Sequence, residues 1–194
     1  MRLFHAASSP FARKVVACAI ARGIEEQITL VPTSTGMPVL AEYNPLGKLP
    51  CLVTNDGVAL FDSRVICEFL DTVGDVYPMF PLHSARIRAL RFQALGDGIA
   101  DALVLRRAEE ARPQETARVA HIAHQTAKVT RSLAFLEQDL PALHLDIGTI
   151  AVACSLGYLD LRFASEPWRE THPKLAAWYA EMLQSPCLAR TIPG

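Results

Sequence analysis

The segment LPCLVTNDGVALFDSRVICEF, residues 49–69, contains the signals that decide the fold of the first part of the chain. Two short apolar runs, residues 51–54 and 58–61, flank Asp56-Gly57, a dipeptide typical of tight hairpin turns. Pro50 precedes the first run, at the start of a strand, where a missing N–H is tolerated. The segment therefore predicts a pair of antiparallel strands.

A helix is expected directly after this hairpin. Asp62 and Ser63 are residue types that cap helix N-termini, and an apolar pattern with helical spacing follows them. The residues of that pattern are Val65, Ile66, Phe69 and Leu70. Residues 49–75 therefore predict the order β-β-α.

The first 31 residues predict a strand, a helix and a second strand. An apolar start is followed by Ser9 as helix N-cap, Pro10 at the first helical position and Gly23 as the stop signal. Residues 28–31 form the second apolar run. The chain then reads β-α-β, a connecting segment and β-β-α, which implies parallel pairing around the first crossover and an antiparallel hairpin after it.

Three motifs in this order resemble the thioredoxin-like domain of glutathione S-transferases. They are Ser-Pro-Phe-Ala-Arg-Lys at residues 9–14, Asn-Pro-Leu-Gly-Lys-Leu-Pro at residues 44–50 and Phe-Asp-Ser at residues 61–63. The similarity continues to the C-terminus and is to small bacterial members with a serine at the first helix. It implies an α/β domain of order β-α-β-α-β-β-α over residues 1–75, a linker over 76–84 and an all-helical domain over 85–194.

Helical spacing governs the second half of the chain. Gly74, Pro78 and Pro81 interrupt the pattern around residues 77–80, which we expect to be an exposed linker. A long helix ending near Ala111 is expected to bury Ile87, Leu90, Ala94, Leu95, Ile99 and Leu103. A second helix carries Ile122, Val129, Leu133, Leu136 and Leu140.

The last two predicted helices begin at Asp146 and at His172-Pro173. Residues 147–159 contain no charged side chain, so this helix is expected to be surrounded by protein. Asp146 can cap it, although Asp146 and Thr149 depart from the Ser/Thr-x-x-Asp capping box of the family. The final helix is expected to run to Leu183 and to stop before Pro186.

Composition and cysteine usage favour a cytoplasmic protein. A net charge of −1 offers no basis for binding nucleic acid or an anionic membrane surface. The five cysteines are odd in number and lack CxxC spacing, which suits a reducing compartment, and we expect no disulfides. We expect no secretory leader, since the first residues lack an apolar leader segment, and no membrane helix, since no run of about 18 apolar residues occurs.

The resemblance assigns Ser9 as the residue that donates a hydrogen bond to the glutathione sulfur, with Ser8 as the fallback. Taken alone, Ser9 is better explained as a plain helix cap, and the resemblance is what favours the role toward the thiol. A free thiol has a pKa near 8.5, so a glutathione-using enzyme has to stabilise the thiolate, and a hydroxyl donor at a helix N-terminus suits that task.

The rest of the glutathione site is also implied by the resemblance. Pro50 would be cis, which exposes the Leu49 backbone for pairing with the cysteinyl part of glutathione. Asp62 and Ser63 would hold the γ-glutamyl end, and Lys48 would pair with the glycyl carboxylate. Ordinary capping by Asp62 and Ser63 and a solvated Lys48 are the alternatives.

The second substrate site is expected between the first loop and the long helix. The resemblance nominates His5, Phe11, Arg106 and Arg107 as its lining. Asp97 and Asp101 resemble a paired-acid pattern that reaches the glutathione ammonium, within one subunit or across a dimer interface, or they lie on an exposed helix face. His121 and His124 lack the companion ligands that a metal site needs, and we expect no metal.

Three functions are compared. The leading one is a glutathione transferase that adds the thiolate of its co-substrate glutathione to a small electrophile, a detoxification activity, in a homodimer. A non-catalytic binding or assembly module on the same fold is the alternative. A thiol-disulfide or deglutathionylating enzyme is a third, but Ser9 and Ala12 stand where its cysteines would be, and Cys51 is expected to point into the core.

Overall fold

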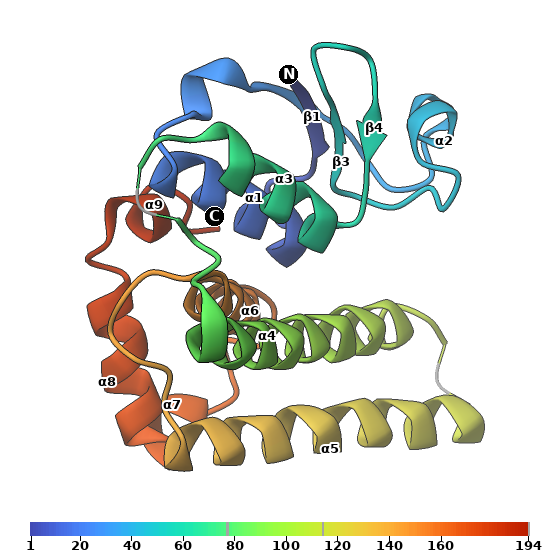
Figure 1. Ribbon diagram of the computed structural model, residues 1–194. Coiled ribbons are helices and arrows are strands. Elements are labelled where there is room, and N and C mark those ends of the chain that lie inside the picture. Colours follow the sequence, from blue (N-terminus) through green and yellow to red (C-terminus); the bar gives the residue numbers. More distant parts are fainter. Residues whose placement is uncertain (77, 114, 194) are drawn as a thin grey trace.

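The computed structural model describes residues 1–76, 78–113 and 115–193. A small mixed sheet with its helices forms the N-terminal part, and helices form the rest (Figure 1). The elements of the N-terminal part are β1 (Arg2–His5), α1 (Pro10–Ala21), η1 (Glu25–Gln27), β2 (Thr29–Pro32), α2 (Pro38–Tyr43), β3 (Cys51–Val53), β4 (Ala59–Leu60) and α3 (Ser63–Val73). Those of the C-terminal part are α4 (His83–Glu110), α5 (Thr116–Gln138), α6 (Ile147–Arg162), α7 (Trp168–Thr171), α8 (Pro173–Met182) and α9 (Pro186–Ala189).

The sheet has the strand order β2-β1-β3-β4. β1 pairs with β2 in parallel and with β3 antiparallel, and β3 and β4 form the expected hairpin. Gly57 adopts a φ of 89° in its turn, and the Thr54 amide donates to the Val58 carbonyl at 2.9 Å. The predicted order β-α-β-α-β-β-α is confirmed. Helices α1 and α3 lie on the side of the sheet that faces the C-terminal helices (Figure 1).

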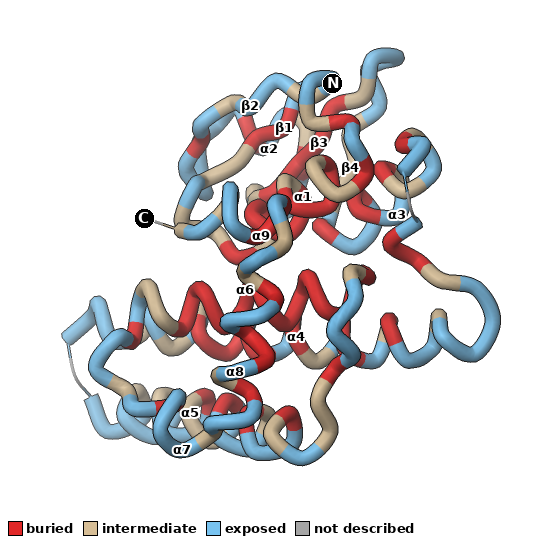
Figure 2. The backbone as a smooth tube through the Cα atoms, turned by 90° about the vertical axis from the view of Figure 1, so that its left-hand side faces the viewer, coloured by how far each residue is buried: buried red, intermediate tan, exposed pale blue. Residues whose placement is uncertain are grey.

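Helix α6 is the central helix of the C-terminal part, as its lack of charge predicted. Residues 147–159 are all buried, and α6 packs against both α4 and α1 (Figure 2). Its start carries a complete capping box. The Thr149 amide donates to Asp146 Oδ1 at 2.8 Å, and the Asp146 amide donates to Thr149 Oγ1 at 2.9 Å. Compared with the Ser/Thr-x-x-Asp box of the family, the acidic and the hydroxyl residue have exchanged positions, but the reciprocal pair of hydrogen bonds remains.

The connection between α3 and α4 is more buried than expected. Met79 and Phe80 are 2% and 5% exposed, so the prediction of an exposed segment is wrong for these two residues. The reason is Asp71 of α3, whose carboxylate accepts the Met79 amide at 2.7 Å and the Phe80 amide at 3.3 Å. Tyr77 lies outside the described residues. We propose residues 76–84 as the linker; α3 ends before it at Val73, and α4 begins within its last residues, at His83.

Helix α4 buries only part of the predicted face. Ile99 and Leu103 are buried, but Ile87 is 69% exposed and Ala94 is exposed, so the prediction was wrong there. The first turn of α4 projects from its neighbours, because residues 82–85 are exposed as well. Helix α5 ends at Gln138, before Leu140. Pro186 opens the short helix α9, and α7 precedes α8; the sequence pattern predicted neither α7 nor α9.

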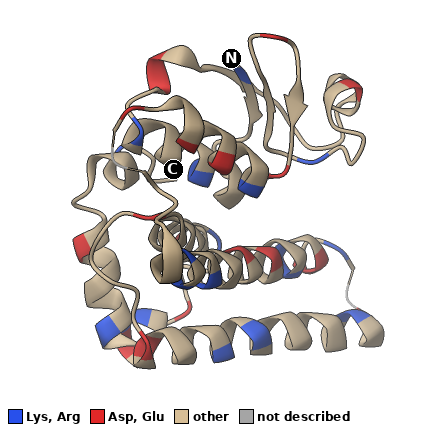
Figure 3. Cartoon of the chain, viewed as in Figure 1, with Lys and Arg blue, Asp and Glu red and all other residues tan. Residues whose placement is uncertain are grey.

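Acidic and basic residues are interspersed over the chain, in keeping with its small net charge (Figure 3). Within the described part of the chain, none of the helices is long and apolar enough to cross a membrane.

Candidate functional site

Ser9 lies at the start of α1, on the loop that follows β1. Its backbone is extended, and its Oγ accepts a hydrogen bond from the Ala12 amide at 3.3 Å, which makes it the N-cap. Pro10 follows as the first helical residue, where no N–H is needed. Because the cap uses Oγ as an acceptor, the hydroxyl proton remains available for another acceptor. Capping and donation to a thiolate therefore do not compete for one proton.

Asn44 organises the loop that leads to β3. It is 1% exposed, its Nδ2 donates to the Lys48 carbonyl at 2.8 Å, and its Oδ1 accepts the Leu46 amide at 3.0 Å. Gly47 supports the turn with a φ of 59°, a conformation that favours glycine. The sequence motif includes Asn44 without indicating this role, which depends on its burial. The loop places Lys48, which is exposed, directly before Leu49.

The Leu49–Pro50 peptide bond is cis, as the resemblance implied. Cys51 follows it with no exposed surface and packs in a small cluster with Phe4, Leu40 and Val53. The expectation that this thiol points into the core as a small apolar group is confirmed. Burial raises the pKa of the Cys51 thiol, which disfavours the thiolate that a redox role would need.

Asp62 and Ser63 begin α3. Asp62 is exposed and caps the helix, its Oδ1 accepting the Arg64 amide at 2.9 Å. Ser63 is the first helical residue and is 2% exposed. A helix N-terminus presents unpaired amides and positive potential, so this end of α3 suits an anion. The starts of α1 and α3 belong to neighbouring, packed helices.

A buried ionic cluster joins these two helices to α4. The Lys14 Nζ of α1 lies 2.6 Å from one oxygen of Asp97, and the Arg64 Nε of α3 lies 2.8 Å from the other. Lys14 and Asp97 are almost fully buried, whereas Arg64 is half exposed. Asp97 is 3% exposed, so the interpretation that it lies on an exposed helix face is wrong. Its pairing with two cations accounts for the burial of a carboxylate. Neither Lys14 nor Arg64 was assigned a role from the sequence.

Asp101 lies one turn beyond Asp97 and is exposed. Desolvation raises the pKa of the Asp101 carboxyl, and the charge of Asp97 adds to the effect, while the positive charges of Arg64 and Lys48 oppose it. Asp101 thus shares its electrostatic surroundings with two residues of the predicted glutathione site, Lys48 and Asp62, and with Arg64.

The four residues expected to line the second substrate site have different surroundings. His5 ends β1 and is half-buried, and this burial lowers the pKa of its imidazole. Phe11, the second residue of α1, is half-buried. Arg106 pairs with Glu110 at 2.8 Å and with Glu166, and its guanidinium stacks over Phe163. The positive charge of Arg106 is therefore paired with groups of the protein itself.

Arg107, by contrast, is exposed near the end of α4 and forms no ion pair with any residue that the structure describes. Of the two adjacent arginines, Arg107 is therefore the one with a charge available to a ligand.

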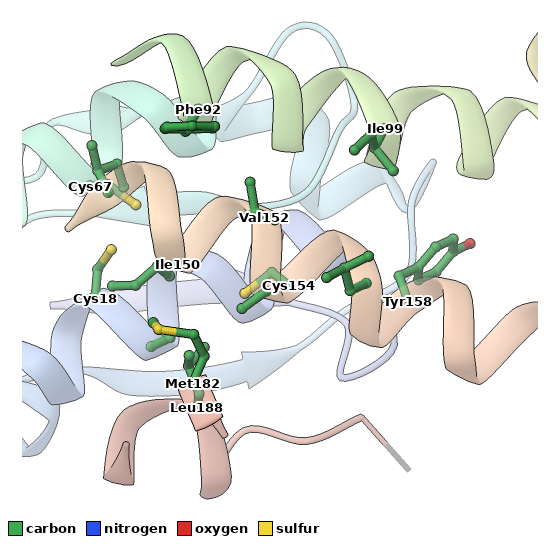
Figure 4. Packing of buried hydrophobic residues seen from close by; sticks show 14 of the residues in the cluster. Cys18, Cys67, Phe92, Ile99, Ile150, Val152, Cys154, Tyr158, Met182 and Leu188 are labelled. Carbon is green, nitrogen blue, oxygen red and sulfur yellow. The ribbon is translucent and has the colours of Figure 1, made fainter. Parts of the chain in front are cut away.

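The remaining cysteines and histidines form no second reactive centre. All five cysteines are buried and free, and Figure 4 shows Cys18, Cys67 and Cys154 among the apolar side chains of α1, α3 and α6. His121 Nε2 lies 3.2 Å from the Gln125 amide nitrogen. Over residues 1–76, 78–113 and 115–193, no three His, Cys, Asp or Glu side chains are grouped so as to hold a metal ion.

Comparison with known proteins agrees with this architecture. Residues 8–73 match the model of the glutathione S-transferase N-terminal domain, and residues 119–181 match that of the C-terminal domain. An uncharacterized GST-like protein of Escherichia coli strain K12, YibF, is 35% identical over 202 residues, covering 100% of this chain and 98% of its own length. The chain belongs to the glutathione S-transferase family.

Three similar structures contain glutathione or an S-substituted glutathione. A glutathione transferase family member from Pseudomonas fluorescens Pf-5 with bound glutathione is 41% identical with a TM-score of 0.92, covering 100% of this chain and 98% of its own. A second structure of a glutathione transferase family member from that organism has S-(propanoic acid)-glutathione bound. It is 42% identical, with full coverage of both chains and a TM-score of 0.89. A glutathione S-transferase from Methylobacillus flagellatus KT with glutathione bound is 37% identical, with a TM-score of 0.91 and coverage of 100% and 99%.

Proposed function

We propose that this protein is a glutathione transferase in which Ser9 stabilises the glutathione thiolate and the thiolate adds to a small electrophile. The observation that carries the proposal is the geometry of Ser9. Its hydroxyl oxygen accepts from Ala12, its proton is free, and it stands at the positive end of the 12-residue helix α1. Membership of the family and glutathione bound in similar structures support the same assignment.

Two modest effects can together stabilise the glutathione thiolate. Lowering a thiol pKa of about 8.5 by about two units requires about 2.7 kcal/mol of preferential stabilisation of the anion. A hydrogen bond to a charged acceptor contributes about 1.5–3 kcal/mol, and a helix N-terminus adds about 0.3–1 kcal/mol. The Ser9 hydroxyl and the start of α1 therefore have the right combined strength.

The other proposed contacts span the rest of the tripeptide. The Leu49 backbone beside the cis Pro50 pairs with the cysteinyl part, and Lys48 pairs with the glycyl carboxylate. Asp62 and Ser63 receive the ammonium and carboxylate of the γ-glutamyl end at the start of α3. Asp101, whose raised pKa reflects the same surroundings, is a second partner for the ammonium, within its own subunit or across a homodimer interface.

For the electrophile, we propose a small molecule with an anionic group. One similar structure binds S-(propanoic acid)-glutathione, a molecule that resembles the product of adding glutathione to such an electrophile. In this chain Arg107 is the available cation, while the half-buried His5 and Phe11 supply less polar surface. With acrylate, a bond would form between the glutathione sulfur and the β-carbon, and the α-carbon would take up a proton.

The two other functions are less well supported. The thiol-disulfide alternative lacks a nucleophile, since Ser9 and Ala12 occupy the helix start and every cysteine is buried. A non-catalytic binding module would keep the glutathione contacts without turnover. Turnover therefore has to be measured separately from binding.

The experiment is titration of reduced glutathione into the wild-type protein and the Ser9→Ala variant, with thiolate absorbance followed against pH and acrylate addition as the turnover assay. Ser8→Ala is the matched control, because Ser8 is equally half-buried but does not cap α1. We expect Ser9→Ala to bind glutathione with an unshifted thiol pKa and to lose conjugation, and Ser8→Ala to behave as wild type. Absence of glutathione binding by the wild type would reject the site, and binding without turnover of any electrophile would favour the non-catalytic module.

A further inference from the structure

Arg13 of α1 is an arginine buried at the boundary between the two parts of the molecule. It is 4% exposed. Its Nη1 donates to the Ala153 carbonyl of α6 at 3.4 Å, its Nη2 to the Leu188 carbonyl of α9 at 3.3 Å, and its Nε to Thr191 Oγ1 at 3.4 Å. All three acceptors belong to the C-terminal part, and two of them lie in residues 186–191, which we call the C-terminal segment.

The guanidinium is closely fitted, and the carboxylate of Asp160 acts on its charge without forming an ion pair with it. Among the described residues Arg13 has no ion pair, in contrast to Lys14, which pairs with Asp97. The Tyr179 hydroxyl lies against the guanidinium, and burial raises the pKa of Tyr179, so the hydroxyl stays protonated. Gly157 leaves the necessary space, since a Cβ there would overlap Arg13 Nη1. The site therefore accepts a planar, positively charged group whose hydrogen-bond partners are carbonyls and hydroxyls.

Arg13 is also one turn away from Ser9 along α1. Its backbone amide donates to the Ser9 carbonyl at 2.9 Å, which is the first hydrogen bond of the helix. The guanidinium thus anchors the same turn of α1 whose start carries the Ser9 hydroxyl. Figure 1 shows α9 and the C-terminal end of the chain beside α1, and α1 contacts α6 and α9 directly.

We propose that Arg13 is a positioning residue for Ser9, and that through it the C-terminal segment sets the geometry of the thiolate site. The inference rests on the proposed function. Three hydrogen bonds from one rigid group fix the first turn of α1 against α6 and α9, so the Ser9 hydroxyl is held where the sulfur binds.

The test compares Arg13→Met, Arg13→Lys and Thr191→Val by the pKa of the bound glutathione thiol and by the separate values of kcat and KM. We expect Arg13→Met to raise the bound-thiol pKa by about half a unit or more and to lower kcat about tenfold, because small displacements of a reacting group are costly. KM for glutathione should change little, since Lys48, Asp62 and Ser63 are untouched. Arg13→Lys and Thr191→Val should shift both values less, in the same direction.

Arg190→Gln is the matched control. It breaks the Arg190–Glu25 ion pair at 3.0 Å in the same segment but removes no partner of Arg13, so it should leave the thiol pKa unchanged. If wild type lowers the thiol pKa and all three test variants keep the wild-type pKa and kcat, Arg13 is only structural and the inference is overturned. If Arg13→Met fails to fold, Arg13→Lys and Thr191→Val decide the matter by the same measurements. A wild type that binds glutathione without lowering its pKa would reject the proposed function itself, and the link to Ser9 with it.

Discussion

Lys14 Nζ and Asp97 Oδ1 lie 2.6 Å apart where α1 meets α4, and both side chains are almost completely buried. The second oxygen of Asp97 pairs with Arg64 at the start of α3. One carboxylate therefore ties together the two helices whose N-termini form the proposed glutathione site. This pair also lies on the boundary between the sheet-containing and the helical parts of the chain.

Replacing Asp97 should destabilise the protein more than replacing either of its partners. Asp97→Asn leaves the Lys14 ammonium buried without a counter-ion, and we expect a loss of about 3–5 kcal/mol in the free energy of unfolding. Lys14→Met should cost less, because Asp97 keeps Arg64, and Arg64→Met should cost least, because that side chain is half exposed. Urea unfolding of the three variants measures this order, and an Asp97→Asn variant as stable as Lys14→Met would contradict it.

Replacing either of two glycines of α4 by alanine should change the stability of the protein, in opposite directions. A Cβ at Gly96 would stand 2.6 Å from the Ala151 backbone carbon of α6, and backbone cannot yield as a flexible side chain does. Gly96→Ala should therefore destabilise by about 2 kcal/mol or more. At Gly98 a Cβ meets nothing within 4 Å, so Gly98→Ala should stabilise by about 0.5–1 kcal/mol. Thermal unfolding separates the two, and equal shifts would show that α4 and α6 are not in close contact at Gly96.

His5 should make the protein less stable below neutral pH. Burial lowers the pKa of its imidazole in the folded state, so the unfolded chain binds more protons once the pH drops below about 6.5. The stability contribution of neutral His5 is then present above that value and is lost as the pH falls through the lower, folded pKa. NMR titration should place the His5 pKa below 6.5, and His5→Gln should remove this part of the pH dependence. A titration at or above 6.5 would contradict the expected burial effect.

Arg106 and Arg107 should separate stability from substrate recognition. Arg107→Ala is expected to raise KM for acrylate several-fold with little effect on folding, because its exposed charge is the one available to an anion. Arg106→Ala should lower the melting temperature instead, since it breaks the contacts with Glu110, Glu166 and Phe163. A neutral electrophile serves as the control substrate, because its KM should not respond to Arg107→Ala. The reverse pattern would move the second substrate site to Arg106.

The exposed start of α4 should be part of a homodimer interface. Leu82 and Ile87 are 73% and 69% exposed, and such apolar surface is commonly covered by a partner. We expect Ile87→Lys to shift the protein from dimer toward monomer in analytical ultracentrifugation, whereas Val119→Lys on α5, 54% exposed, should not. A wild-type protein that is monomeric at micromolar concentration would reject the dimer.

Much of the fold follows from signals that act over a few residues. Ser9-Pro10 begins a helix, Asp56-Gly57 makes a hairpin turn, and Asp62 caps α3, because each depends on local backbone geometry and hydrogen bonding. The uncharged run at residues 147–159 likewise predicted the buried helix α6. The cis bond at Pro50 came from resemblance to a family and not from local sequence.

The environment of each polar or apolar side chain depends on tertiary packing. Sequence spacing alone does not show that Asp97 is buried between two cations, that Ile87 is left uncovered, or that Arg106 is paired while Arg107 is not. The contacts of Arg13 with Leu188 and Thr191 join residues about 175 positions apart. Burial and pairing of this kind depend on which helices pack together. Local sequence signals therefore account for most of the elements, although not for α7 and α9, and for the likeness to the family, whereas packing determines how the site is held.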